Sequence, residues 1–517
     1  MVLKPFADQK QKERYLFILP FQNNFMKKIK TLLLIFSIVF FLTLPERVEA
    51  EEIIKVYGCE RLNVSNSRYV LQANIIVNSS CFSINANNLV FDLNNHVIKH
   101  AEMSLKSPLS YGIFVSEKSN VEITNGFISG FGRDIFVLNS NKIKISKMEL
   151  STDGFFGNST TIAPIYIDTA DKLEIKDISI TKGKNRGSYT NVYGLSINKM
   201  NNSKLFNVNV INVSKSPNTV GSSGRGIRLS QSSNNELKSI MLRDTNFAFE
   251  MYNGENNIIE NIRMENNSHG GLNLLSYSNN NQIKNARVMK SGVSGITLGG
   301  QNNTISDSLI EQNTYGISFA GSNRNNRVEN IILKNNQISI EIDEGSVNTV
   351  IDHAQLHDSQ FFGIWFWGGT TWATENILIK NSNIENSGES DVYFWRAGGE
   401  NIIFEDSNLS TYFIEAENKF GIRKTGFGEI RFIQPVTGSG SFNDITINNN
   451  RALINAELNP GLNKKARIVL SNVLLPYEPQ KFKILRNRQP CQSCMILSSG
   501  EKEIIFAVPG EGSYSLA

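Results

Sequence analysis

Residues 295–326 read GITLGGQNNTISDSLIEQNTYGISFAGSNRNN and contain one unit twice. In each copy a Gly-Ile dipeptide opens a short stretch of alternating apolar and polar residues, and an Asn pair follows. The unit recurs in both directions along the chain with spacings of 21 to 24 residues. One equivalent position is occupied by Gly226, Ala248, Gly271, Gly295, Gly316, Ser339 and Gly363, and the Asn pairs stand at 234/235, 256/257, 280/281, 302/303 and 325/326.

Strands this short cannot bury an apolar face alone. Stacking each coil on the next pairs every strand in parallel and closes a continuous interior, so the repeat predicts an all-β fold, a parallel β-helix solenoid. A leucine-rich repeat has a similar period, but Ile, Val, Leu and Phe interchange freely here. Asparagines suit the repeated turn because they tolerate the left-handed conformation. A second turn column is predicted at Asn261, Asn285, Asp307, Asn330 and Asp352.

The repeat also predicts how the chain is divided. Residues 1–50 form an N-terminal extension and signal peptide, because Lys27, Lys28 and Lys30 precede an apolar run from Leu32 to Leu44 and a small-residue cleavage site. This run is too short to span a membrane, so no membrane span is expected after cleavage. Residues 51–86 are expected to cap the solenoid, residues 87–410 to form the β-helix and residues 411–517 to form a C-terminal β domain. The expected location is secreted, periplasmic or at the cell surface.

The charge of the chain after residue 50 is balanced. Residues 1–50 hold eight of the 52 Lys and Arg and four of the 48 Asp and Glu, which leaves a net charge of about zero for the remainder. A neutral chain lacks the basic surface that phosphate neutralisation requires, so nucleic acid is not an expected partner. Neutrality also argues weakly against strongly anionic polysaccharides.

The four cysteines form two local pairs, Cys59 with Cys81 and Cys491 with Cys494. Disulfides are expected for both, because an exported protein folds in an oxidising compartment. The C-x-x-C spacing of Cys491 and Cys494 also permits a redox motif or half of a zinc site, but no second ligand pair lies nearby.

The Gly-Ile strands and Asn-Asn turns resemble the right-handed parallel β-helix repeats of pectate-lyase-like and NosD-like exported proteins. The resemblance covers about residues 85 to 410 and extends to the segment after Cys59 and Cys81, where Val90-Phe91-Asp92-Leu93 is similar to a first coil. It implies export and association with carbohydrate. Some NosD-like proteins are associated with copper, but no cluster of Met, His and Cys occurs in this sequence. His353 and His357 are too far apart on an extended chain to share one ion, so no metal and no cofactor are expected.

Strand alternation predicts which side chains point outward. If Ile364 and Phe366 point inward, Trp365 and Trp367 point outward, and in the next coil Tyr393 and Trp395 do the same. We expect these four rings to form a carbohydrate-binding surface, because exposed amphipathic rings suit the flat faces of sugars. The alternative is that the C-terminal domain packs over them.

The preceding coil places Glu341 and Asp343 in the same two columns. Two residues apart on a strand, they are separated by about 6.5–7 Å, near the lower limit for the two carboxyls of an inverting glycosidase. They are the candidate catalytic pair, although exposed acidic pairs are more often solvated surface. Farther along the same columns, Arg228, Glu250 and Tyr252 would extend the surface.

Two functions remain open at this stage. The first is an exported or cell-surface protein that binds polysaccharide or a cell-surface glycan through the outward aromatic face. Whether it also acts on the glycan, as a lyase, epimerase or hydrolase, stays open. The second is a structural or adhesive surface protein without catalysis. A pocket with perturbed carboxyl groups would favour the enzyme, and a uniformly polar surface would favour the adhesin.

Overall fold

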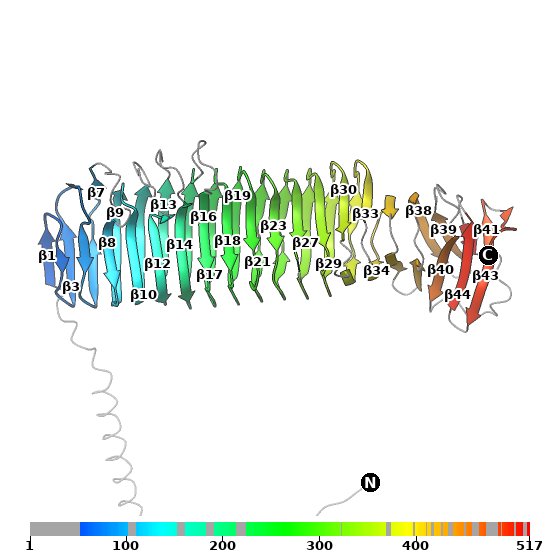
Figure 1. Cartoon of the computed structure of the whole chain (residues 1–517), viewed down its shortest axis with the longest axis horizontal. Helices are drawn as coiled ribbons and strands as arrows, with labels where there is room; N and C mark the ends of the chain where they lie inside the picture. The colour runs from blue at the N-terminus through cyan, green and yellow to red at the C-terminus, as the bar shows by residue number, and fades with distance from the viewer. Residues whose placement is uncertain are drawn as a thin grey trace, which may run out of the picture. The chain divides into compact units, whose positions relative to one another are not determined.

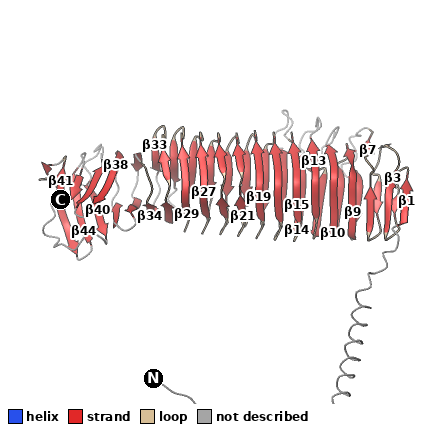
Figure 2. Ribbon diagram, turned by 180° about the vertical axis from the view of Figure 1, so that it is seen from behind, coloured by secondary structure: helices blue, strands red, loops and turns tan. Residues whose placement is uncertain are grey.

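The computed structural model describes residues 52–101, 110–151, 161–181, 191–213, 224–321, 323–368, 374–395 and 399–409, and shorter segments between 411 and 516. The predicted signal segment, residues 1–50, lies outside this part of the chain. Every described element is a strand, and Figure 2 shows strands joined by turns throughout. No helix of the described residues has the length and apolar character needed to cross a membrane.

The strands stack as the coils of a right-handed parallel β-helix. Figure 1 shows the coils following one another in chain order. Each coil contributes to three faces, and each strand pairs in parallel with its equivalents in neighbouring coils. The first face is built from β2 (Arg61–Leu62), β5 (Phe82–Ile84), β8 (Tyr111–Ser116), the start of β10 (Arg133–Ser151), β11 (Thr161–Ile162), β12 (Ile165–Asp171), β14 (Asn191–Asn201), β16 (Gly224–Ser230), β18 (Phe247–Tyr252), β20 (Gly270–Leu274), β23 (Ser294–Leu298), β26 (Tyr315–Phe319), β28 (Ile338–Asp343), β30 (Phe362–Trp367), β33 (Ser390–Trp395) and β35 (Thr411–Ile414).

The second and third faces are formed by longer strands that bend between them, and in some coils by two separate short strands. They comprise β1 (Glu52–Val56), β3 (Ser67–Leu71), β4 (Ile75–Val77), β6 (Leu89–Asp92), β7 (Val97–His100), β9 (Ser119–Ser129), the end of β10, β13 (Glu174–Thr181), β15 (Lys204–Ile211), β17 (Glu236–Arg243), β19 (Ile258–Glu265), β21 (Gln282–Lys284), β22 (Arg287–Met289), β24 (Thr304–Ser306), β25 (Leu309–Glu311), β27 (Arg327–Lys334), β29 (Val350–His357), β31 (Thr374–Lys380), β32 (Asn383–Glu385), β34 (Gly399–Glu405) and β36 (Asn418–Lys424).

Parallel pairing already begins within residues 52–84, the segment predicted to cap the solenoid, since β2 pairs with β5 and β3 with β6. Antiparallel pairing begins where β35 meets β38 (Gly438–Asn448) and β36 meets β37 (Gly428–Phe432). The remaining strands are β37 (Gly428–Phe432), β38 (Gly438–Asn448), β39 (Arg451–Ala456), β40 (Lys465–Ser471), β41 (Ile484–Arg486), β42 (Gln489–Pro490), β43 (Met495–Gly500), β44 (Glu503–Pro509) and β45 (Tyr514–Leu516), and their pairings are antiparallel. The predicted boundaries at residues 86 and 410 stay predictions.

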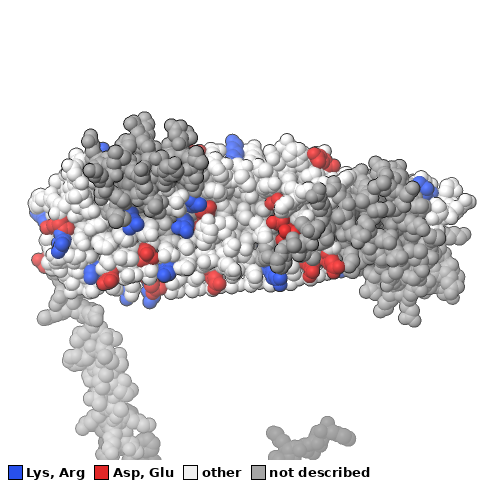
Figure 3. Space-filling view, in the orientation of Figure 1, with Lys and Arg blue, Asp and Glu red and all other residues white. Residues whose placement is uncertain are grey.

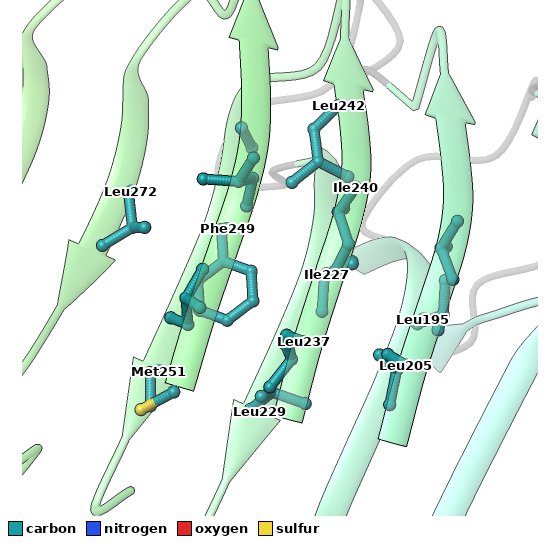
Figure 4. Close-up of a cluster of buried hydrophobic side chains, with 14 of the residues drawn as sticks. Leu195, Leu205, Ile227, Leu229, Leu237, Ile240, Leu242, Phe249, Met251 and Leu272 are labelled. Carbon is teal, nitrogen blue, oxygen red and sulfur yellow. The ribbon is translucent and has the colours of Figure 1, made fainter. Parts of the chain in front are cut away.

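The interior is a continuous apolar column formed by the inward side chains of all three faces. Figure 4 shows part of it, where Leu229, Leu237 and Phe249 meet between neighbouring coils. Farther along, the rings of Phe366 and Phe394 stack with centroids 4.4 Å apart. Inward residues of the first face therefore hold that face rigidly, and their outward neighbours are presented in straight rows.

The glycine column lies at the start of the first-face strands. A Cβ atom on Gly271 would lie 2.3 Å from the carbonyl oxygen of Gly295, and one on Gly295 would lie 2.7 Å from that of Gly316. Glycine is therefore required there by the close approach of consecutive coils. Ala248 and Ser339 occupy the same column in other coils and are fully buried. A small side chain is therefore accommodated in those two coils.

The first Asn of each predicted pair adopts the left-handed conformation, with φ of 56° at Asn280 and Asn302 and 55° at Asn325. The same conformation marks the bend between the second and third faces, at Asn261, Asn285, Asp307 and Asn330. In the next coil the turn residue was predicted to be Asp352, and this prediction is wrong by one position. His353, with φ of 52°, takes the left-handed position, because Glu329 pairs with Asp352 and so places Asn330 opposite His353.

Candidate functional site

The candidate site lies on the outward side of β28, β30 and β33. In the register of these strands, Glu341 pairs with Trp365, which pairs with Tyr393. Two residues farther along each strand, a second row is formed by Asp343, Trp367 and Trp395. The structure therefore brings the six predicted site residues together on one face in two adjacent rows.

The rings of these rows contact one another, and we call Trp365, Trp367, Tyr393 and Trp395 the aromatic platform. Trp367 and Trp395 are stacked, with centroids 6.0 Å apart and planes at 17°. Trp365 lies 6.4 Å from Trp367 and 6.2 Å from Trp395. Trp367 remains 37% exposed, whereas the other three rings are partly buried.

An open pocket of about 470 Å³ lies over the platform, and its lining also includes Glu341 and Tyr315. The ring of Tyr315 stacks on that of Trp365, with centroids 6.3 Å apart and planes at 14°. Tyr315 therefore adds an aromatic residue to the lining that the sequence prediction did not include. The indole nitrogen of Trp365 is buried and has no hydrogen-bond partner among the described residues. Buried polar atoms are usually paired, so this donor is an exception among the described side chains of the site.

The two carboxyl groups beside the platform have perturbed acidities. Burial raises the pKa of Glu341, a hydrogen bond of 2.6 Å from the Ser318 hydroxyl opposes this rise, and Asp343 adds to it. Burial also raises the pKa of Asp343, although it accepts hydrogen bonds from the backbone N–H groups of Glu344 and Gly321. Both groups therefore keep their proton to a higher pH than exposed carboxyls do.

A second cluster lies on the same face, on β14, β16 and β18, four to six strand steps from β28 toward the N-terminus. Glu250 forms an ion pair with Arg225, and the hydroxyl of Tyr252 lies 3.5 Å from the same carboxylate oxygen. Arg228 lies over the rings of Tyr193 and Tyr252, 5.8 and 5.4 Å from their centroids. The sequence prediction included Arg228, Glu250 and Tyr252 but missed Arg225 and Tyr193, which stand in the next outward column.

A third cluster was also missed by sequence reasoning. Phe114, Phe136 and Tyr166 follow one another in the outward column that leads to Trp365, with ring centroids 5.0 and 5.5 Å apart. The Arg133 guanidinium lies 4.0 Å from the centroid of Tyr166. These rings could have been predicted by identifying, in every earlier coil, the outward position equivalent to Trp365. Figure 3 shows that charged side chains are sparse on the side of the stack that it displays.

Both expected disulfides are present. Cys59 is bonded to Cys81 and Cys491 to Cys494, and the described residues contain no free cysteine. The S–S bond between Cys59 and Cys81 ties the first coil to the start of the next.

Residues 209–410 match the family described as "Periplasmic copper-binding protein (NosD)". Among solved structures, the chain is similar to the periplasmic alginate epimerase AlgG, with 11% identity, coverage of 61% of this chain and 76% of that chain, and a TM-score of 0.43. It is also similar to the Dettilon tailspike protein, with 11% identity, 90% and 87% coverage and a TM-score of 0.45. A GH87 α-1,3-glucanase from Streptomyces thermodiastaticus gives 14% identity, 57% coverage of both chains and a TM-score of 0.40. No curated protein matched.

The residues of the matched stretch do not fit a copper site. It contains three histidines and no cysteine. The ring nitrogens of His353 and His357 lie 2.7 and 2.8 Å from the carboxylates of Asp352 and Glu385. In the described part of the chain no three His, Cys, Asp or Glu side chains gather as ligands would. The repeat, the fold and the family match together identify a right-handed parallel β-helix protein whose residues 209–410 are similar to the NosD family.

Proposed function

We propose that this protein acts outside the cytoplasm and binds polysaccharide through the aromatic platform. The location rests on three observations: the signal-like segment before residue 51, two disulfides, and similarity to a family described as periplasmic. Each is typical of a protein that folds after export.

The pocket over the platform carries the binding proposal. Its lining combines five aromatic rings with one carboxyl group. Aromatic side chains offer a large contact area at low entropic cost, and a few polar groups in an apolar pocket orient a ligand. Trp367 keeps 37% of its surface exposed, which supports an open binding surface over one covered by packing.

The test of binding is the double variant Trp367→Ala with Trp395→Ala. A stacked ring contributes about 0.5–1.5 kcal/mol beyond its buried area, so the variant should bind a recognised glycan about tenfold more weakly or worse. Its thermal midpoint should change little, because outward rings contribute little to the core. The matched control is Tyr57→Ala, an exposed ring away from the site at 68% exposure. Glycan-array screening followed by calorimetry measures the effect. A large loss of stability with unchanged binding would mean that the rings serve packing.

The perturbed carboxyl pair supports a second candidate, turnover of the bound polysaccharide. In hydrolysis, Glu341 would donate its proton to the glycosidic oxygen while Asp343 takes a proton from the attacking water. A lyase or epimerase would use the pair for proton abstraction and return. An adhesive or structural protein needs only the platform.

Asp343→Asn separates these candidates. It should leave glycan binding within about twofold, because the side chain keeps its shape, and it should abolish product release if the pair is catalytic. Asp307→Asn, an acid at a bend on another face, is the control. Chromatographic product analysis of the unmodified protein and both variants shows whether the carboxyl pair is catalytic. Equal turnover in the unmodified protein and Asp343→Asn would reject catalysis by this pair, and no turnover by the unmodified protein would leave the adhesive function.

A further inference from the structure

The second cluster of the first face holds two cations and one carboxylate. Glu250 is only 3% exposed and is paired with Arg225. Arg225 also lies between two rings, 5.6 Å from the centroid of Tyr193 and 5.5 Å from that of Phe247. The one carboxylate of the cluster is thus already engaged, and the cluster carries a net positive charge.

Arg228 supplies that surplus charge. Its guanidinium lies over Tyr193 and Tyr252, and no carboxylate within salt-bridge distance is found for it among the described residues. The side chain is half-buried, so water compensates its charge only in part. A planar guanidinium held against aromatic faces keeps its N–H edge free for a carboxylate or sulfate. This local excess of positive charge is not visible in the net charge of the chain, which is balanced.

The cluster and the platform lie along one outward column. Five strand steps lead from Arg228 to Glu341, a separation of about 24 Å at about 4.8 Å per step. The positions between Glu250 and Glu341 in this column carry only small polar side chains: Asn273, Thr297 and Ser318. Small side chains rise little above the strands, and Asn273 and Ser318 are themselves buried. A short oligosaccharide covers a distance that one sugar cannot.

We propose that Arg228 is a subsite for the anionic group of an acidic polysaccharide whose neighbouring sugars extend along the first face to the aromatic platform. This inference rests on the proposed function and names its ligand class, a glycan bearing carboxylate or sulfate. Arg225 and the two tyrosines act as positioning residues, because they hold the Arg228 side chain and neutralise Glu250 beside it.

The test is calorimetric titration of the full exported chain with three hexasaccharides: one of uronic acids, its carboxyl-reduced neutral counterpart, and a sulfated one. At least one anionic probe should bind about tenfold or more tightly than the neutral one, since hydrogen bonds to charged groups are stronger than those between neutral groups. Arg228→Gln should remove this difference, and Arg228→Lys should keep part of it. Added salt should weaken only the anionic probe.

Two matched variants complete the design. Arg263→Gln removes an arginine of β19, on a different face, and should leave the preference intact. Thr297→Trp fills the stretch between the clusters, so it should remove the preference while leaving a neutral disaccharide bound at the platform. The anionic probe whose affinity falls in Arg228→Gln shows whether carboxylate or sulfate is the recognised group.

Equal affinity for neutral and anionic probes, or an anionic preference that survives Arg228→Gln, would overturn the subsite. If the platform double variant still loses neutral binding in that case, the proposed function stands alone. If no hexasaccharide binds the unmodified protein, both proposals fall.

Discussion

At the scale of single residues, the two members of each Asn pair have different roles. Asn281 is fully buried; its side-chain amide donates to the carbonyl of Gly254 and to Asn303, and its oxygen accepts from Asn257. Asn280 is exposed and left-handed, and it accepts one bond from Asn302. The buried member links coils through a hydrogen-bond ladder, whereas the exposed member makes the turn.

This difference predicts unequal costs of substitution. Asn281→Ala should lower the free energy of unfolding by about 2–4 kcal/mol, because it removes the oxygen that accepts from both the backbone N–H and the side-chain amide of the buried Asn257. Asn280→Gly should cost less than about 1 kcal/mol, since glycine adopts positive φ freely. Thermal denaturation of both variants measures the difference. Equal losses would show that the ladder adds nothing beyond the turn.

At the scale of the strand, the spacing between coils is set by backbone contact at the glycine column. Strands β20 and β23 approach so closely that a Cβ on Gly271 would meet both the Gly295 carbonyl and, at 2.6 Å, a methyl group of Val288. Such a contact cannot be relieved by a flexible side chain alone, because one of its partners is backbone. The strands would have to separate and weaken their parallel hydrogen bonds.

Gly271→Ala should therefore destabilise the protein by about 1–3 kcal/mol, the usual cost of overpacking. Amide hydrogen exchange should show the loss of protection in β20 and β23 first. The matched substitution is Gly58→Ala, because nothing lies within 4 Å of a Cβ at that position. An unchanged exchange pattern in Gly271→Ala would mean that the coils adjust freely and that the column reflects turn preference.

At the scale of the whole molecule, a solenoid is stabilised by contacts between neighbouring coils, so its ends are the least stable part. The disulfide between Cys59 and Cys81 closes a segment with a sequence separation of 22 at the N-terminal end of the stack. Cys59 is exposed, so a reductant can reach this bond. The disulfide thus stabilises the coil that has a neighbour on one side only.

Replacing both Cys59 and Cys81 by Ser should cost about 3 kcal/mol at that end. Hydrogen exchange should increase in β1 to β5, while the coils from β20 to β28 keep their protection. Replacing Cys491 and Cys494, with a separation of only 3, should have a smaller effect. A uniform loss of protection along the stack would contradict nearest-neighbour stabilisation.

The sequence by itself determined the β-helix, the glycine and asparagine columns, and the outward rows that contain Glu341, Asp343, Trp365 and Trp367. It could do so because a repeat of constant period and a side-chain alternation of two together define the register, wherever the period holds. Where a coil shifts by one residue the method fails, as it did when His353 took the left-handed position predicted for Asp352.

Only the tertiary structure decided which outward side chains interact. The stacking of Tyr315 on Trp365, the pairing of Arg225 with Glu250 and the raised pKa of Glu341 depend on side-chain positions and burial in adjacent coils. A register gives the row in which a residue stands, but the direction of its side chain and the water that remains around it follow from packing. For that reason the sequence indicated the face, and the structure separated it into an aromatic platform with an acidic pair and a cationic cluster about 24 Å away.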